Sequence, residues 1–377
     1  MTRPLCFLIG AGWAGSAVGQ YYRALGCELA ARGHRVLFLV DGRRTHLAEP
    51  AANPAIYVWP SARPTRPADF RFAHRLIAHH RPDGVIAAFG AVNTLILTAW
   101  LNRVPVRVAW YTTVSQNADL EPGLSGGQLA WLRRRKQWVY AISSHVAAVS
   151  DAAADDLGHV FNVPATRRTV WRRLLADPVP GLAAEPRAPQ RIVCAGRLIS
   201  IKGQDILIRA LPALAQRFPD VQLELLGDGA QAETYRQLAA ELGVADRVCF
   251  AGQVAHRRVL ERMAAAAVVV VPSRSEALGA VNVEALAVGT PVVAANVGGI
   301  GEVVRDGVDG YLVPPDDVAA LAERIGRLLA DPAQRAAFGD NARRGFLERF
   351  ELDAGIARHA QWYEALVAAS GAVTELE

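Results

Sequence analysis

Apolar and polar positions along the chain follow two periods, and their order predicts the fold class. Short apolar runs rich in β-branched residues, such as 35–40, 191–196 and 266–271, predict buried strands. Longer stretches with helical spacing, such as 17–32 and 202–214, lie between such runs. Strands that alternate with helices form parallel sheets covered by helices. The pattern therefore predicts an α/β protein.

Length and proline content predict two domains. A chain of 377 residues exceeds one ordinary domain. The segment 177–190 has four prolines and little apolar periodicity, which predicts a linker. We expect an N-terminal doubly wound domain over 1–176, a second over 191–352, and a C-terminal segment 353–377 that contains a helix. Five prolines between Pro50 and Pro67 predict a connection rather than a regular element. The run 147–151 predicts the last strand of the first domain and a helix cap.

The chemistry centres on residues 273–285. A strand ended by Pro272 leads through a small-residue loop into a helix, and the first N–H groups of that helix favour an anion. Glu276 and Glu284 frame this turn with seven residues between them, so they do not share one helical face and are expected to contact different parts of a ligand. Arg197 and Lys202 follow the strand 191–196, where cations would neutralise a diphosphate.

In combination, Gly196-Arg197, Lys202-Gly203, Glu276 and Glu284 resemble the donor site of the retaining nucleotide-sugar glycosyltransferases of family 4. The resemblance implies two Rossmann-like domains that face a central cleft, the GT-B architecture. It also suggests that the helix in 353–377 crosses back onto the first domain. It also implies transfer of a sugar from a nucleoside diphosphate to an acceptor hydroxyl with retention at the anomeric carbon. Leu278 stands where the family commonly has phenylalanine.

The resemblance assigns roles by position. Arg197, Lys202 and Glu276 form the expected catalytic group, because charge develops on the β-phosphate as it departs and needs fixed donors. Glu276 is expected to accept from the transferred sugar and Glu284 from the ribose, and no protein nucleophile is assigned. The full donor-binding set is Gly15, Ser16, Gly196, Arg197, Lys202, Gly252, Val254, Glu276, Ala277, Leu278, Gly279, Ala280, Val281 and Glu284. No aspartate cluster with metal spacing accompanies them, so we expect neither a metal nor a cofactor beyond the nucleotide sugar.

A competing motif lies near the N-terminus. Gly10-Ala-Gly12-Trp-Ala-Gly15 is a literal dinucleotide fingerprint, which leaves a nicotinamide- or flavin-dependent oxidoreductase as an alternative. However, 17 residues separate Gly15 from Gly33, more than the compact dinucleotide unit usually has. The longer helix resembles the first unit of family 4, whose loop approaches the donor sugar and the acceptor. A non-catalytic sugar-nucleotide-binding protein is a third hypothesis.

Polar residues end the predicted strand 104–111, at the position where ligands bind in open sheets. Family 4 often has a histidine there, and this chain has none between 110 and 117. We assign tentative sugar or acceptor contacts to Gly12, Tyr111, Thr112 and Thr113. The alternative is a turn whose hydroxyls are satisfied within the protein.

Charge divides unevenly along the chain. Residues 1–180 carry 21 Lys and Arg against 11 Asp and Glu, a balance of +10, and the remainder carries 20 against 25, a balance of −5. A basic N-terminal half suits an anionic membrane or an acidic acceptor, and the lack of a recognised module argues against nucleic acid. The predicted helix 128–142 places Trp131 and Trp138 on one side, so it either packs on the core or lies at a membrane interface. We expect a cytoplasmic protein, with peripheral contact to the inner face of a membrane as an open alternative.

Two residue types predict no site. The four cysteines form no C-x-x-C pair, so we expect buried free thiols. His74, His79 and His80 are expected on a solvated helix surface rather than at a metal.

Overall fold

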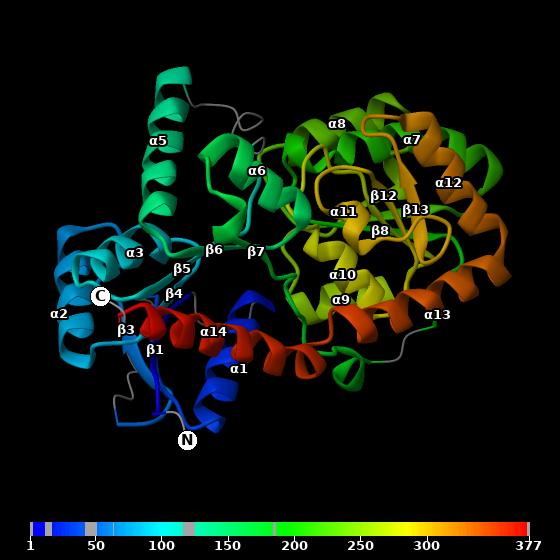
Figure 1. The fold of residues 1–377 in the computed structure, drawn as a ribbon. Helices are drawn as coiled ribbons and strands as arrows, with labels where there is room; N and C mark the ends of the chain where they lie inside the picture. The colour runs from blue at the N-terminus through cyan, green and yellow to red at the C-terminus, as the bar shows by residue number, and fades with distance from the viewer. Residues whose placement is uncertain are drawn as a thin grey trace. The chain divides into compact units, whose positions relative to one another are not determined.

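The chain forms two compact units (Figure 1). The computed structural model describes residues 3–11, 17–41, 51–62, 64–115, 125–183 and 186–374. Unit 1 contains residues 1–112, 124–176 and 352–377, and unit 2 contains residues 113–123 and 177–351. In the described part of the chain, no helix combines the length and the apolarity needed to cross a bilayer.

Unit 1 is built on a parallel seven-stranded sheet with the order β3-β2-β1-β4-β5-β6-β7. Its strands are β1 (Cys6–Gly10), β2 (Arg35–Val40), β3 (Ala55–Val58), β4 (Gly84–Ala87), β5 (Val106–Tyr111), β6 (His145–Ala148) and β7 (Arg168–Val170). Its helices are α1 (Ala17–Ala31), α2 (Pro67–His80), α3 (Ala91–Leu101), α5 (Gly126–Ile142), α6 (Asp151–Phe161) and α14 (Leu352–Thr374).

Unit 2 has a parallel six-stranded sheet with the order β10-β9-β8-β11-β12-β13. Its strands are β8 (Arg191–Ala195), β9 (Gln222–Leu226), β10 (Val248–Phe250), β11 (Val268–Val271), β12 (Val292–Ala295) and β13 (Gly310–Val313). Its helices are α7 (Gln204–Arg217), α8 (Ala232–Glu241), α9 (His256–Ala264), α10 (Ala280–Ala287), α11 (Ile300–Val303), α12 (Val318–Ala330) and α13 (Pro332–Arg349). The predicted α/β class with two doubly wound sheets is confirmed. The arrangement of the two sheets about a cleft stays a prediction.

The central strands explain why the apolar runs were informative. Val268–Val271 forms β11, and all four of its valines are buried. A parallel strand covered by helices on both faces has no solvent side, so its sequence is a continuous apolar run. The strand pairs with β8 on one side and β12 on the other, at the centre of unit 2.

Two predictions about unit 1 were wrong. The proline-rich segment 50–67 contains β3, an edge strand paired with β2, because its prolines flank the strand and leave its own N–H groups intact. The run 147–151 was expected to supply the last strand, yet β7 pairs beyond β6. Of the two alternatives left open for helix 128–142, the exposure of Trp131 and Trp138 disfavours core packing at these two positions.

The cysteine prediction was half right. All four cysteines are free, but only Cys194 is fully buried. Cys27 lies on the solvent side of α1 and Cys249 on the edge strand β10, and both are exposed.

The predicted linker is anchored to unit 2. Asp177 accepts two hydrogen bonds from Arg343 on α13, at 2.8 and 2.5 Å. Arg187 donates to the carbonyl oxygen of Gly289 at 2.6 Å. These contacts fix both ends of the segment 177–190.

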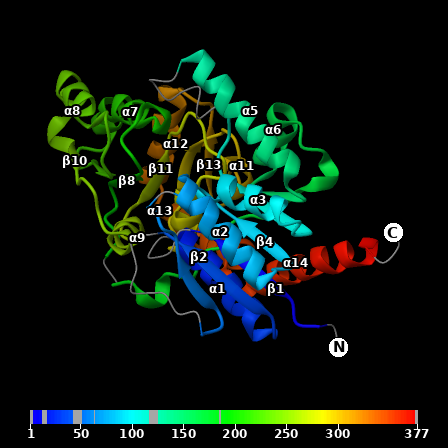
Figure 2. The same cartoon turned by 90° about the vertical axis from the view of Figure 1, so that its left-hand side faces the viewer.

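The C-terminal helix α14 completes unit 1, and Figures 1 and 2 show it alongside α1. Its His359 Nδ1 lies 2.7 Å from the hydroxyl of Tyr21 on α1, and its Tyr363 hydroxyl accepts from the indole of Trp110 at 2.7 Å. The Glu364 carboxylate on α14 accepts two hydrogen bonds from the Arg32 guanidinium, at 2.8 and 2.9 Å. Burial in this contact lowers the pKa of His359 to about 3.

Candidate functional site

Strand order in unit 2 places its candidate site between β8 and β11. The chain order of the strands reverses there, and open parallel sheets bind ligands outside the carboxyl ends of the strands at such a switch point. Gly196 and Arg197 directly follow β8, and the loop 272–279 follows β11. The two predicted halves of the site therefore lie at the same edge of one sheet, with the Arg197 side chain exposed.

The two loops touch through their backbones. Gly203 has φ +66°, and a Cβ atom there would lie 2.1 Å from the carbonyl oxygen of Pro272. The N–H of Arg274 donates to the carbonyl oxygen of Ile201 at 2.8 Å. Only glycine permits this approach, so the segment that carries Lys202 is held directly against the loop after β11.

Arg274 fixes that loop through its side chain. Its guanidinium donates to both carboxylate oxygens of Asp205, at 2.9 and 2.8 Å, and to Asp316 at 2.8 Å. The hydrogen bonds with Asp205 raise the pKa of Arg274 further above its usual range. Local spacing does not single out Arg274, because its partners come from α7 and from the loop after β13.

Lys202 and Glu276, predicted to serve different parts of a ligand, form an ion pair. The Lys202 Nζ lies 2.5 Å from Glu276 Oε1, which also accepts from the hydroxyl of Ser273 at 3.1 Å. The side chains are 24% and 13% exposed, so the pair is shielded but not sealed from water. One carboxylate thus links the end of β11 to the cation that follows β8.

The N-terminus of α10 contains buried polar groups without partners. Gly279 is the N-cap at φ +79°, and a Cβ atom there would lie 2.4 Å from Nδ2 of Asn282. Asn282 is fully buried, and neither of its amide atoms has a hydrogen-bond partner in the part of the chain that the structure describes. The buried hydroxyl of Ser275 likewise has no partner among the described residues. Such groups are costly and therefore rare in folded proteins, and here they lie at a helix end that favours anions.

The remaining residues predicted in this loop divide by exposure. Ala277 and Leu278 are buried, so their side chains belong to the interior. Ala280 and Val281, the first two residues of α10, are half-buried. Their main-chain N–H groups are the ones that a helix leaves unpaired at its start.

Glu284 has a partner that the sequence analysis missed. Its Oε1 lies 3.0 Å from Nε2 of His256, the first residue of α9, and Glu284 is only 9% exposed. The segment before α9 contains the predicted Gly252 and Val254, and Gly252 accepts from the N–H of Gly227 at 2.9 Å. His256 therefore joins the loop after β10 to the carboxylate on α10. Its position four residues after Gly252 was the available signal.

The residues predicted in the N-terminal part of the chain are less informative. Gly12, Gly15 and Ser16 lie outside the described residues. Tyr111 is buried and its hydroxyl donates to Asp156, which favours the alternative of a satisfied hydroxyl. Thr112 is half-buried and Thr113 is exposed.

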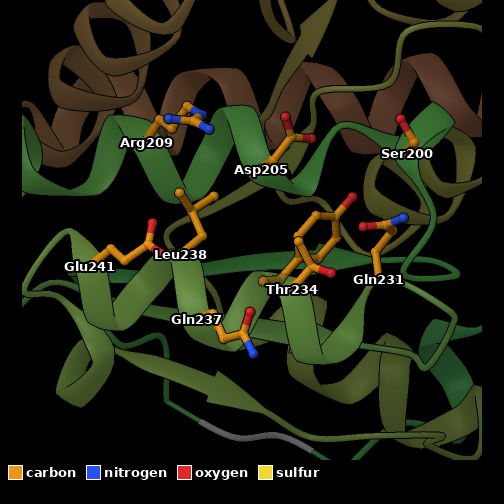
Figure 3. A pocket seen from close by; sticks show the side chains of 9 residues that line it. Ser200, Asp205, Arg209, Gln231, Thr234, Gln237, Leu238 and Glu241 are labelled. Atoms are coloured by element: carbon orange, nitrogen blue, oxygen red, sulfur yellow. The ribbon is translucent and has the colours of Figure 1, made fainter.

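A separate hollow of about 280 Å³ lies between α7 and α8 (Figure 3). Tyr235 lines it, and its buried hydroxyl has no hydrogen-bond partner within the described ranges of the chain. Burial raises the pKa of this hydroxyl to about 12. Asp205 borders the hollow and is the residue that holds Arg274, so the hollow adjoins the support of the site.

Both halves of the chain match family models of one enzyme class. Residues 183–345 match the model described as glycosyl transferases group 1, and residues 18–174 match the model described as glycosyltransferase family 4.

Curated relatives match over part of their length. The GDP-mannose-dependent α-(1-6)-phosphatidylinositol monomannoside mannosyltransferase of Mycolicibacterium smegmatis is 41% identical over 177 residues, which are 45% of this chain and 46% of the relative. The D-inositol 3-phosphate glycosyltransferase of Xylanimonas cellulosilytica is 36% identical over 254 residues, 60% of this chain and 58% of the relative. The chain thus spans about half the length of these relatives.

Solved structures match nearly the whole chain. Sucrose-phosphate synthase from Thermosynechococcus elongatus has a TM-score of 0.75 at 24% identity, covering 97% of this chain and 100% of that one. HepE of Anabaena, solved with UDP and glucose, has a TM-score of 0.75 at 23% identity, covering 96% of this chain and 100% of that one. These likenesses show the fold.

Proposed function

The chain belongs to glycosyltransferase family 4, and from that premise we propose that it transfers a sugar from a nucleoside diphosphate to an acceptor hydroxyl. The observation that carries the proposal is the meeting of Lys202 and Glu276, 2.5 Å apart, at the switch point of unit 2. The cation can bind the phosphate, and the carboxylate can accept hydrogen bonds from sugar hydroxyls. Phosphate and sugar are the two parts of a nucleotide sugar that meet at its reacting centre.

The diphosphate is bound by cations and by backbone N–H groups. Arg197 and Lys202 neutralise its charge, and the N–H groups of Gly279, Ala280 and Val281 donate to its oxygens. These donors are held in place before the reaction, so they stabilise the charge that appears on the β-phosphate as it departs.

The two carboxylates bind opposite ends of the donor. Glu276 accepts from hydroxyls of the transferred sugar, and Glu284, held by His256, accepts from the ribose. The main chain around Gly252 and Val254 contacts the base. The base, the diphosphate and the sugar then lie along the carboxyl edge of the sheet in unit 2.

The reaction proceeds with retention. The bond between the anomeric carbon and the β-phosphate oxygen breaks, the acceptor oxygen bonds to the same face of that carbon, and the acceptor proton passes to the departing phosphate. Arg197 and Lys202 supply the positive charge for this departure, so we propose that transfer does not depend on a metal. Turnover in excess EDTA is expected to equal turnover in Mg²⁺.

The relatives and neighbours narrow the substrates to be tested first. One curated relative is named for GDP-mannose and phosphatidylinositol monomannoside, another for inositol 3-phosphate, and a structural neighbour was solved with UDP and glucose. We propose a hexose nucleotide as donor and an inositol-bearing glycolipid precursor as acceptor. An acceptor of that kind places the enzyme at the inner face of a membrane, which agrees with the basic N-terminal half.

A donor panel tests the proposal. GDP-mannose, UDP-glucose and their diphosphates are screened by thermal unfolding, in which a ligand at 100 times its dissociation constant stabilises by about 2.7 kcal/mol. Stabilising donors are then incubated with inositol phosphate or phosphatidylinositol, and the anomeric configuration of the product is measured by NMR. An inverted product removes the retaining assignment.

The alternatives give different outcomes in the same assays. Binding of NAD(P) at 1:1 stoichiometry without binding of any nucleotide sugar favours the oxidoreductase. Tight donor binding with neither transfer nor donor hydrolysis favours the non-catalytic binding protein. Either result overturns the proposed function.

A further inference from the structure

Four large apolar side chains on two neighbouring helices of unit 1 are exposed. Trp100 and Leu101 end α3 and are 42% and 59% exposed, and Trp131 and Trp138 on α5 are 59% and 54% exposed. The rings of Trp100 and Trp138 meet edge to face with centroids 6.0 Å apart. Among the described residues these are four of the eight exposed large apolar side chains. Single exposed apolar residues are ordinary, but a contiguous group marks an interaction site.

Arginines share the same face of α5. Arg134 and Arg135 lie between the two tryptophans at i+3 and i+4, so all four side chains project from one side of the helix. The Arg135 guanidinium lies over the Trp131 ring at 4.8 Å. We call Trp100, Leu101, Trp131, Arg134, Arg135 and Trp138 together the Trp–Arg surface. Figure 1 shows the N-terminal half of α5 projecting beyond the sheet of unit 1.

The two helices that carry this surface contain no acidic residue. No Asp or Glu occurs between residues 84 and 118 or between 125 and 150, which include α3 and α5. Arg133 and Lys136 add two cations to α5, and Asp156 on α6 acts electrostatically on Lys136. The surface is therefore both apolar and positively charged.

We propose that the Trp–Arg surface docks on an anionic lipid bilayer. Tryptophan rings bind at the level of the lipid headgroups, where arginines beside them meet phosphate. Two-fold pairing of the surface with a second copy would instead bring like charges together. The docking deepens the proposed function and rests on it in one respect: it would hold unit 1 next to an acceptor carried by lipid.

Vesicle flotation of the whole protein tests the docking. The vesicles contain phosphatidylcholine alone, or phosphatidylcholine and phosphatidylglycerol at 3:1, at low salt. Anionic vesicles are expected to bind at least tenfold more tightly, and 0.5 M NaCl is expected to weaken that binding because it screens charges. The double variant R134A/R135A is expected to bind about 30-fold more weakly, since each basic residue near such a surface contributes about fivefold. W131S/W138S is expected to weaken binding about tenfold.

A matched control separates this surface from general attraction. R71A/R75A on α2 also removes two exposed arginines of unit 1, four positions apart on one helix. Its affinity for anionic vesicles is expected to stay within threefold of the wild type. The proposal is overturned if the wild type does not bind anionic vesicles, or if the control variant weakens binding as much as R134A/R135A. It is also overturned if W131S/W138S converts a dimer into a monomer in sedimentation, because the surface is then an interface between copies.

Donor binding distinguishes failure of the docking from failure of the proposed function. Calorimetry without vesicles is expected to give the same donor affinity for W131S/W138S as for the wild type, because Lys202, Glu276 and Glu284, the proposed donor-binding side chains, belong to unit 2. Lys202→Met is expected to lose donor affinity and keep vesicle binding. A variant of the Trp–Arg surface that loses both donor affinity and vesicle binding has two explanations: it is misfolded, or the donor site and the surface are not separate. Thermal unfolding of that variant distinguishes the two.

Discussion

Replacing Lys202 and Glu276 one at a time and together tests whether they act as one unit. Lys202→Met removes the cation, and Glu276→Gln keeps the shape of its partner but removes the charge. In the structure the two side chains are 2.5 Å apart and mostly shielded from water. Each loss is expected to cost about 1.5–3 kcal/mol of donor affinity, the range for hydrogen bonds to charged groups. That cost corresponds to about 10- to 150-fold.

The loss of donor affinity in the double variant shows whether Lys202 and Glu276 act independently. If Lys202 bound only phosphate and Glu276 bound only sugar, the two losses would add to about 3–6 kcal/mol. Because the ion pair joins them, we expect the double variant to lose at least about 1 kcal/mol less than that sum. The second substitution then removes a group whose partner is already missing.

Calorimetry of donor binding and kcat/KM for transfer measure this cycle. Arg209→Met is the matched control, since it removes one exposed cation from α7, the helix that begins just after Lys202. It is expected to leave donor affinity within twofold. Additive losses would refute the coupling, and losses below threefold in both single variants would refute the site.

The remaining predictions concern other supports of the fold and site. His256→Ala leaves Glu284 without its N–H partner and is expected to raise the donor KM about fivefold, about 1 kcal/mol, with kcat little changed; steady-state kinetics with His256→Gln as the rescue variant check this. Gly279→Ala is strained at φ +79° and places its Cβ 2.4 Å from a side-chain amide. Gly243→Ala, at φ +67° with open space around the new Cβ, is the control and is expected to cost roughly 1–2 kcal/mol. Denaturation is expected to show a greater loss of stability for Gly279→Ala, and equal losses would contradict the steric reasoning. Burial lowers the pKa of His359 from 6.5 to about 3, so below pH 6.5 the unfolded chain binds a proton that the folded chain does not. Stability is therefore complete above pH 6.5 and is expected to fall by about 2 kcal/mol at pH 5, a slope in urea unfolding that His359→Gln should flatten.

The local pattern of apolar residues was sufficient to predict elements that are uniformly buried and consecutive in the sequence. The valine run 268–271 and the helix after Gly279 are adjacent in sequence, so the strand, loop and helix around Glu276 were predictable from spacing alone. Edge elements were not predictable in this way. The strands β3 and β7 are short, and each pairs with a single neighbour.

Long-range contacts account for the other omissions. Lys202 and Glu276 are 74 residues apart, and His256 and Glu284 are 28 apart. Periodicity places a side chain on a face of its helix but does not say whether another element covers that face. Trp131 and Trp138 show this limit, because their spacing indicated one side of α5 and only the structure shows that side exposed.

The return of α14 to unit 1 has a consequence for synthesis on the ribosome. The first 176 residues emerge without the helix whose His359 is hydrogen-bonded to Tyr21 and whose Tyr363 accepts from the indole of Trp110. At about 5–20 residues per second, roughly 10–40 s pass before residues 352–374 are translated. During that interval the nascent N-terminal segment exposes apolar surface that α14 will later cover, so a ribosome stalled within unit 2 would hold a chain that chaperones recognise.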